Sequence, residues 1–160
     1  MDKHIVNQWI LTRGLINLSP GQYAKIVDFF MKEDNLKAEQ ITAEYLLQKV
    51  KDIKCKALKI KCEETIEGGF TSTNGNYYRT NRDDQLNMVG QKDYLKDFPD
   101  HLVYWKTENA GYVAHEPADW LKHVYAEGFA HKQRTLFRYD YLKSVVNKAT
   151  DSTQVIQVEW

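Results

Sequence analysis

One apolar seam, which runs through residues 42–67, constrains the fold more than any other feature of this sequence. Its members recur at alternating spacings of three and four residues, at Ala43, Leu46, Val50, Ile53, Ala57 and Ile60. This spacing is typical of an α-helix and of the seam of a short coiled coil. Lysines divide between the two flanks of the seam, as on a solvated helix whose lysine stems lie along an apolar stripe. We therefore predict one long helix that ends at Gly68-Gly69, because glycine adopts the left-handed cap conformation without a Cβ clash.

Residues 1–35 predict a compact pair of helices. Apolar residues at helical spacing precede Gly14, which indicates the end of the first helix. The second helix begins at Ser19-Pro20-Gly21-Gln22, with serine as the N-cap, proline at the first helical position and glutamine closing a capping box.

The polar segment 68–80 predicts a β-hairpin. Asn74-Gly75 favours a two-residue type I′ turn, which matches the twist of the two strands that it joins. In the register that this turn sets, Phe70 and Tyr77 share one face of the hairpin. A helix with an acidic first turn comes next, and Gly90 would end it.

The rest of the chain predicts a second hairpin, another long helix and a terminal strand. Strand-like residues 102–106 and 112–114 flank a short turn, Pro117 begins a helix that reaches about Ala149, and residues 155–160 alternate as a strand does. The predicted fold class is α+β, mostly helical. It comprises two long antiparallel helices with two small β-hairpins and a short C-terminal strand, preceded by the N-terminal helical pair.

Charge and apolar patterning exclude several classes of protein. The 22 basic and 22 acidic residues give no net charge, so neither nucleic acid nor an acidic membrane is indicated as a partner. No window approaches the roughly 18 apolar residues of a membrane-spanning helix, and the N-terminus does not resemble a secretory signal. Cys55 and Cys62 lie about 10 Å apart along the predicted helix, so we expect two reduced thiols.

Side chains that could carry chemistry form no recognised motif. His115-Glu116 precede Pro117, which leaves no HExxH helix, and no cluster of Cys and His has the spacing of a zinc site. Carboxylates on either side of the first hairpin have the character needed for glycoside hydrolysis. The same carboxylates are equally expected as solvated helix surface and as acidic first-turn residues. We expect no catalytic residue, no metal ligand and no cofactor.

Aromatic residues exceed what a small α+β core needs. They are Tyr77, Tyr78, Tyr104, Trp105, Tyr112, Trp120, Phe137, Tyr141 and Trp160. Tyr and Trp are enriched in protein interfaces, and exposed rings are equally suited to stacking on sugars. Phe137 and Tyr141 point away from the apolar side of their predicted helix, so we expect these two residues to face a partner.

Several separated motifs resemble a known family. They are Cys62-Glu63-Glu64-Thr65-Ile66-Glu67-Gly68-Gly69-Phe70-Thr71-Ser72, Tyr78, Asp84-Gln85 with Asn87 and Gly90, Trp105-Lys106-Thr107-Glu108 before Gly111, Leu142-Lys143, and Val158-Glu159-Trp160. In this order they resemble a domain of unknown function that recurs in bacteriophage and prophage proteins of the tail and tail-fibre region. The resemblance spans about residues 42–160. A short Asn-Gly hairpin stands where relatives often carry a longer loop.

The resemblance implies a structural virion protein of the tail, baseplate or fibre region that acts as an adaptor and has no established catalytic residues. We divide the chain into an N-terminal helical docking segment, residues 1–35, and a tail-associated domain, residues 36–160. The candidate docking residues are Trp9, Ile10 and Phe30. The candidate interface residues are Leu46, Val50, Ile53, Ile60, Tyr77, Tyr78, Trp105, Phe137 and Tyr141.

The expected partners are other virion proteins, and the apolar seam predicts a homo-oligomer. We expect a protein that is made and assembled in the host cytoplasm and ends in the tail region of the virion. Two alternatives remain open. One is a tail-fibre assembly chaperone that is not retained in the virion. The other is a host-glycan-binding module that uses Tyr77, Tyr78, Tyr104 and Trp105 as stacking platforms.

Overall fold

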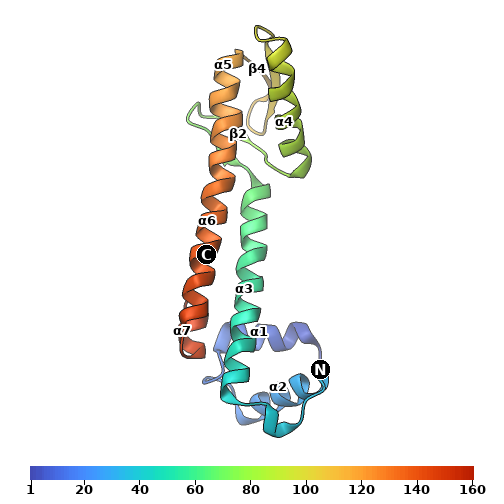
Figure 1. Cartoon of the computed structure of the whole chain (residues 1–160), viewed down its shortest axis with the longest axis vertical. Coiled ribbons are helices and arrows are strands. Elements are labelled where there is room, and N and C mark those ends of the chain that lie inside the picture. Colours follow the sequence, from blue (N-terminus) through green and yellow to red (C-terminus); the bar gives the residue numbers. More distant parts are fainter. The chain divides into compact units, whose positions relative to one another are not determined.

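Helix ends follow the capping residues of the sequence in the computed structural model, which describes residues 1–160. Figure 1 shows the helices and strands of the chain. Helix α1 (Lys3–Arg13) ends at Gly14, and α2 (Pro20–Glu33) begins after Ser19. The Ser19 hydroxyl accepts a hydrogen bond from the Gln22 amide at 3.2 Å, and the Gln22 side chain accepts one from the Ser19 amide at 3.0 Å. The predicted capping box is therefore confirmed.

The chain is mostly helical, with two small pairs of antiparallel strands. After α2 come η1 (Ala38–Gln40), α3 (Ala43–Gly68), β1 (Phe70–Thr71), β2 (Tyr77–Tyr78), α4 (Arg82–Asp97), β3 (Val103–Thr107), β4 (Gly111–His115), α5 (Pro117–Trp120), the π-helical segment η2 (Leu121–Ala126), α6 (Glu127–Lys148) and α7 (Ser152–Ile156). The chain divides into two compact units. The first unit comprises residues 1–60 and 139–160, and the second unit comprises residues 61–138. No helix combines the length and the apolar character needed to cross a membrane.

The core of the first unit joins both ends of the chain. Its buried members are Val6, Ile10, Ile26, Phe30, Leu46, Val50, Leu58, Val146, Ala149, Val155 and Val158. The Ser152 hydroxyl also accepts a hydrogen bond from the Leu15 amide at 3.0 Å. Residues 1–35 therefore pack into the same core as α3 and the chain's last residues, and this unit does not follow the predicted boundary at residue 35.

The apolar seam of α3 is buried only in its first half. Leu46 and Val50 are fully buried, whereas Ile60 is 55% exposed. Burial continues instead at Leu58, Cys62 and Ile66, so buried positions recur every four residues. An α-helix has 3.6 residues per turn, so residues spaced four apart form a stripe that turns gradually around the helix axis. The buried stripe therefore departs from the straight seam that the sequence predicts.

Several lysines of α3 make specific polar contacts and are not simply solvated. The Lys51 ammonium donates a hydrogen bond to the Asn147 carbonyl at 2.8 Å, and the Lys54 ammonium donates one to the Ile156 carbonyl at 3.1 Å. These carbonyls belong to the last turns of α6 and α7, where a cation is stabilised by the helix dipole. Lys49 pairs with Asp34.

The predicted C-terminal strand is wrong, because residues 152–156 form α7. The Asp151 side chain caps this short helix by accepting a hydrogen bond from the Gln154 amide at 2.8 Å. Val155 and Val158 are both buried. A spacing of three residues is typical of a helix, and the burial of these two valines outweighs the strand-like alternation of Ile156, Val158 and Trp160.

The first hairpin forms with a register that differs from the predicted one. Phe70 pairs with Tyr78, and Ser72 donates its amide to the Asn76 carbonyl at 2.8 Å across a three-residue loop. Gly75 adopts a φ of 87°, which is the left-handed residue of the common three-residue turn. The slip of one residue places Tyr78, and not Tyr77, in the core beside Phe70, with 5.8 Å between the ring centroids.

The second hairpin consists of β3 and β4, the other pair of strands in the chain. Strands β3 and β4 pair antiparallel over five residues each, with Val103 opposite His115.

Helix α4 continues through Gly90 to Asp97, so the predicted stop at this glycine is wrong. The predicted helix 117–149 divides into α5, η2 and α6. The core of this unit consists of Phe70, Tyr78, Met88, Leu95, Val103, Trp120 and Val124.

Both cysteines are free thiols, and each unit holds one of them. Burial raises the pKa of the Cys55 thiol and that of the Cys62 thiol. Cys62 is 3% exposed, and its sulfur lies 3.8 Å from the Thr135 carbonyl oxygen.

Candidate functional site

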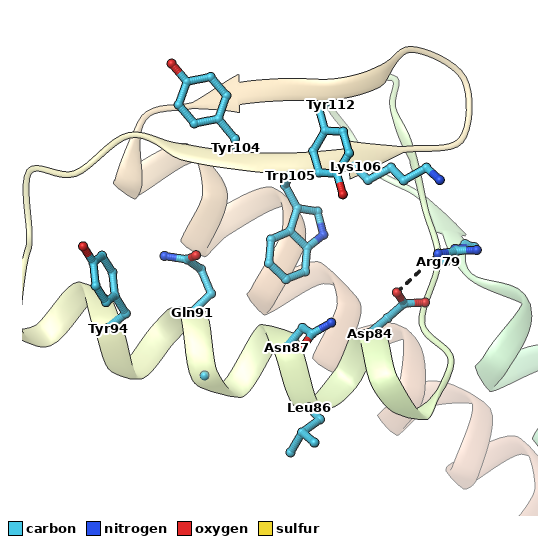
Figure 2. Close-up of a pocket in the computed structure, with 11 residues that line it drawn as sticks. Arg79, Asp84, Leu86, Asn87, Gln91, Tyr94, Tyr104, Trp105, Lys106 and Tyr112 are labelled. Carbon is cyan, nitrogen blue, oxygen red and sulfur yellow. Dashed lines mark ion pairs between the residues drawn. The ribbon is translucent and has the colours of Figure 1, made fainter.

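A cleft of about 570 Å³ lies in the second unit, where the β3–β4 hairpin faces α4 (Figure 2). Its lining residues are Arg79, Asp84, Leu86, Asn87, Gly90, Gln91, Tyr94, Tyr104, Trp105, Lys106 and Tyr112. The cleft unites two motifs that lie apart in the sequence. Asp84, Asn87 and Gly90 come from α4, and Trp105-Lys106 come from β3.

One face of α4 supplies the polar wall of the cleft. Asp84, Asn87, Gln91 and Tyr94 recur at spacings of three, four and three residues, so they lie on one face of the helix. Figure 2 shows Asn87, Gln91 and Tyr94 projecting towards the hairpin and Leu86 projecting away from it. The start of α4 fixes this face, because the Asp84 amide donates to the Asn81 side chain at 2.8 Å and the Asp84 carboxylate accepts from the Asn81 amide at 3.1 Å.

The hairpin supplies the aromatic wall. Tyr104 and Tyr112 are 66% and 74% exposed, and they come from neighbouring strands. Trp105 points to the opposite face of β3, because successive side chains alternate along a strand. Its ring is half-buried and meets the buried ring of Trp120 edge-on, with 5.2 Å between the centroids.

Charges at the cleft are close to balanced. The Arg79 guanidinium lies 3.7 Å from the Asp84 carboxylate and 3.0 Å from that of Glu108. Lys106 adds a second cation on the same hairpin. No group of three or more His, Cys, Asp or Glu side chains is arranged to hold a metal ion.

A second surface of the same unit is an apolar groove of about 450 Å³ between α4 and α6. Its lining residues are Thr80, Gln85, Met88, Val89, Tyr125, Gly128, Phe129, Lys132, Gln133, Leu136 and Phe137. Phe129 and Phe137 are 60% and 66% exposed. Lys132 donates a hydrogen bond to the Gln85 side chain at 2.6 Å, which links the two helices across the groove.

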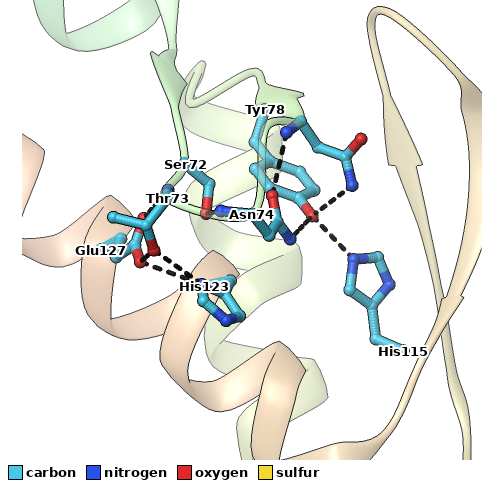
Figure 3. A network of polar contacts seen from close by, with 8 residues as sticks. Ser72, Thr73, Asn74, Tyr78, His115, His123 and Glu127 are labelled. Carbon is cyan, nitrogen blue, oxygen red and sulfur yellow. Dashed lines mark hydrogen bonds and ion pairs between the residues drawn. The ribbon is translucent and has the colours of Figure 1, made fainter.

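A polar network holds the first hairpin against the second hairpin (Figure 3). The His115 Nδ1 donates to the Val113 carbonyl at 2.9 Å, because a carbonyl oxygen can only accept. The His115 Nε2 therefore accepts from the Tyr78 hydroxyl at 2.7 Å. The side-chain amides of Asn74 and Asn76 donate to the same hydroxyl at 2.8 and 3.3 Å.

A carboxylate holds the tip of the hairpin against the start of α6. Glu127 accepts hydrogen bonds from the Thr73 amide, at 2.9 Å, and from the Thr73 hydroxyl. His123, in η2, lies 3.0 Å from the same carboxylate. Burial opposes ionisation of Glu127, but these hydrogen bonds outweigh it and lower the pKa to about 2. Glu127 is therefore an ionised structural anchor of the hairpin.

The family model described as Domain of unknown function (DUF4376) matches residues 49–159, which is more than half of the chain. The chain belongs to this family. The DUF4376 region contains the whole cleft and the whole apolar groove, and it begins inside α3. Neither the comparison with curated proteins nor the comparison with solved structures finds a match.

The predicted interface residues of the DUF4376 region divide into core and surface. Val50 and Tyr78 are fully buried, as is Leu46 just before the region, so these three side chains are not available to a partner. The others are at least partly exposed, and they are Ile53, Ile60, Tyr77, Trp105, Phe137 and Tyr141. Of these, Trp105 lies in the cleft and Phe137 in the groove.

The predicted docking residues lie before the DUF4376 region. Ile10 and Phe30 are buried in the core of the first unit, and Trp9 packs partly buried against that core. These residues therefore hold residues 1–35 to the rest of the first unit in this structure. The docking role of the segment stays a prediction.

Several residues of both surfaces were missed by the sequence analysis. Gln91 and Tyr94 form the cleft's α4 wall together with Asn87, which the sequence analysis named only within a family motif, and their helical spacing with Asp84 was a usable signal. Phe129 and Leu136 line the groove and are exposed, and the sequence analysis named neither of them. The π-helical η2 lies just before them and adds a residue to its turn, which rotates the side chains of α6 about the helix axis.

Proposed function

We propose that this protein is a structural bacteriophage virion protein of the tail, baseplate or fibre region, where it acts as a non-enzymatic adaptor through protein–protein contacts. The observation that carries the adaptor role is the apolar groove between α4 and α6. Contiguous exposed apolar surface is uncommon on monomeric proteins and marks sites where other proteins bind.

The groove has the features of a protein interface. Phe129, Leu136 and Phe137 are exposed along α6, and Val89 is 58% exposed on the α4 side. Lys132 and Gln133 add polar groups among these residues. Large rings surrounded by polar groups are the arrangement that most often carries binding energy when proteins associate.

The location in a phage tail is supported by the resemblance of the separated motifs alone. We further propose that α3 and α6 pack antiparallel within each unit. Contacts inside each unit support this pairing. Residues 51 and 147 are hydrogen-bonded in the first unit, as are residues 65 and 131 in the second unit.

The first experiment is mass spectrometry of purified particles from the phage or prophage that encodes the protein. An adaptor is expected at a fixed ratio to the major tail protein, in a small multiple set by the symmetry of the tail. Absence from particles despite expression during infection would replace the adaptor with a fibre-assembly chaperone, whose client would occupy the groove only transiently.

A substitution tests the groove itself. Phe137→Ser removes an exposed ring from the groove, so we expect normal folding and at least about a tenfold loss of incorporation into particles. Tyr141→Ser is the matched control, because Tyr141 is on the same helix and 68% exposed but outside the groove. Equal incorporation of wild type and Phe137→Ser would remove the groove from the proposal.

A further inference from the structure

We propose that the cleft between α4 and the β3–β4 hairpin is a binding site for a neutral oligosaccharide. This inference does not depend on the adaptor role, because the cleft and the apolar groove share no lining residue. It rests on the rings, the amides, the rigidity and the charge of the cleft.

The aromatic wall offers exposed ring faces. Tyr104 and Tyr112 are 66% and 74% exposed, although neither ring is needed to fill the core. Trp105 lies on the opposite face of β3 from Tyr104, and its ring is the one that projects towards α4 (Figure 2). The C–H faces of a sugar ring are apolar and flat, so they pack on aromatic faces while the hydroxyl groups at the ring's edge reach polar partners.

The polar wall offers the groups that sugar hydroxyls require. The side-chain amides of Asn87 and Gln91 project from α4 towards the hairpin (Figure 2). Neither side chain makes a hydrogen bond within the protein. An amide side chain both donates and accepts, which matches a hydroxyl group in either role. From Asp84 to Tyr94 the helix advances about 15 Å, a length that suits a short chain of sugars and exceeds a single ring.

Several side chains of the cleft are already fixed in place. The Tyr94 ring stacks on Phe98 with 4.6 Å between centroids, and its hydroxyl lies 3.1 Å from the His101 Nδ1. Trp105 is held against the buried Trp120. A ligand that binds to fixed groups loses less free energy to ordering the site, so weak individual contacts can sum to measurable affinity.

The charge of the cleft selects against strongly ionic ligands. Arg79 is neutralised by Asp84 and Glu108, and Asp84 in turn lies in the same cleft as Lys106. A polyanion would meet the Asp84 carboxylate, and a polycation would meet Arg79 and Lys106. A neutral chain of hexoses, deoxyhexoses or N-acetylhexosamines meets neither penalty.

The test uses the full chain on an array of neutral oligosaccharides built from these three sugar classes, with uronate-containing and sialylated oligosaccharides as acidic members. The strongest neutral ligand is then titrated by NMR. We expect binding in the micromolar to millimolar range, with shifts in the side-chain amide signals of Asn87 and Gln91. Tyr112→Ala and Asn87→Ala should each weaken binding at least about fivefold.

Matched controls keep the result specific to the cleft. Tyr141→Ala removes an equally exposed tyrosine outside the cleft, and Phe137→Ser alters only the groove, so both variants should bind the ligand as wild type does. The proposal is overturned if no neutral oligosaccharide binds or if only acidic members bind. It is equally overturned if Tyr112→Ala and Tyr141→Ala weaken binding to the same extent.

Discussion

Glu127 shows how one side chain fixes the position of a loop far away in the sequence. Its carboxylate accepts hydrogen bonds from Thr73 at the tip of the first hairpin and lies beside His123 on η2. The hairpin strands themselves are only two residues long, which is too short for independent stability. The tip of the hairpin therefore depends on this carboxylate.

Acid should weaken this anchor in a defined range of pH. The folded pKa of Glu127 is about 2, against an ordinary value of 4.5, so its contribution is present above pH 4.5 and is lost as the pH falls towards 2. Glu127→Gln should lower the free energy of unfolding by roughly 2 kcal/mol at pH 6, and the difference from wild type should vanish near pH 2.

Urea unfolding across this pH range measures the effect, with Glu63→Gln as a control for the loss of one exposed carboxylate. A stability difference between wild type and Glu127→Gln that stays constant from pH 6 to pH 2 would contradict the assigned role of the carboxylate.

At the scale of elements, the junction between α3 and β1 depends on two adjacent glycines in very different surroundings. Gly69 has a φ of 94°, and a Cβ at this position would clash with the Tyr78 carbonyl oxygen and lie 3.1 Å from the Arg79 Cα. Gly68, the last residue of α3, has open space where a Cβ would be. The pair therefore tests the junction with its own internal control.

Gly69→Ala should destabilise the protein by about 2–4 kcal/mol, because it combines an unfavourable backbone conformation with a clash against the main chain of β2. Gly68→Ala should change stability by less than about 1 kcal/mol, since alanine favours the helix in which it would lie. Thermal unfolding of both variants decides the matter, and equal melting temperatures would refute this account of the junction.

The same junction shows what the sequence could predict and what it could not. The Ser19 cap is local, because it is satisfied by Gln22 three residues later, and the end of α3 at Gly68 follows from the backbone freedom of the glycine pair, so both predictions were confirmed. The hairpin register depends on whether Tyr77 or Tyr78 meets the core, which residues distant in sequence decide. The sequence of the hairpin alone does not show which of the two tyrosines packs into the core.

The candidate cleft could not be predicted from the sequence for a related reason. Its aromatic residues were recognised as surplus rings, and Trp105 was singled out, but their amide partners on α4 were not. Asn87 was quoted only as part of a family motif and Gln91 has no unusual sequence context, and only the packing of the β3–β4 hairpin against α4 brings both amides into one cleft with the aromatic residues. The cleft is formed by the packing of the β3–β4 hairpin against α4, which neither segment of the sequence predicts by itself.

At the scale of the whole molecule, the N-terminal helices belong to the core of the first unit. Val6, Ile10, Ile26 and Phe30 are at most 3% exposed. Each buried apolar side chain of this size contributes about 1.5–3 kcal/mol, so together they provide as much as the net stability of a small domain. The two units, in contrast, have separate cores.

Deletion of residues 1–35 should therefore unfold the first unit and leave a chain that aggregates. In NMR spectra, the indole signal of Trp160 should lose its native position, because this ring packs on the core of the first unit, whereas Trp105 and Trp120 report on the second unit. A soluble remainder with a native Trp160 signal would instead favour an independent docking segment.

Point variants refine this test without a deletion. Ile26→Ala should cost about 2–5 kcal/mol, because Ile26 is fully buried. Ile16→Ala, at a position that is 70% exposed, should cost almost nothing. Similar losses in the two variants would mean that the helical pair is not held by the core described above.

The two free thiols make the native protein its own reporter of local opening. Cys55, which is partly buried, belongs to the first unit and the buried Cys62 to the second, and burial raises the pKa of both thiols. Alkylating reagents react with the thiolate, so modification of each cysteine should wait until its surroundings open. Mass spectrometry of the two modified peptides would measure the rate of local opening in each unit separately, without an introduced label.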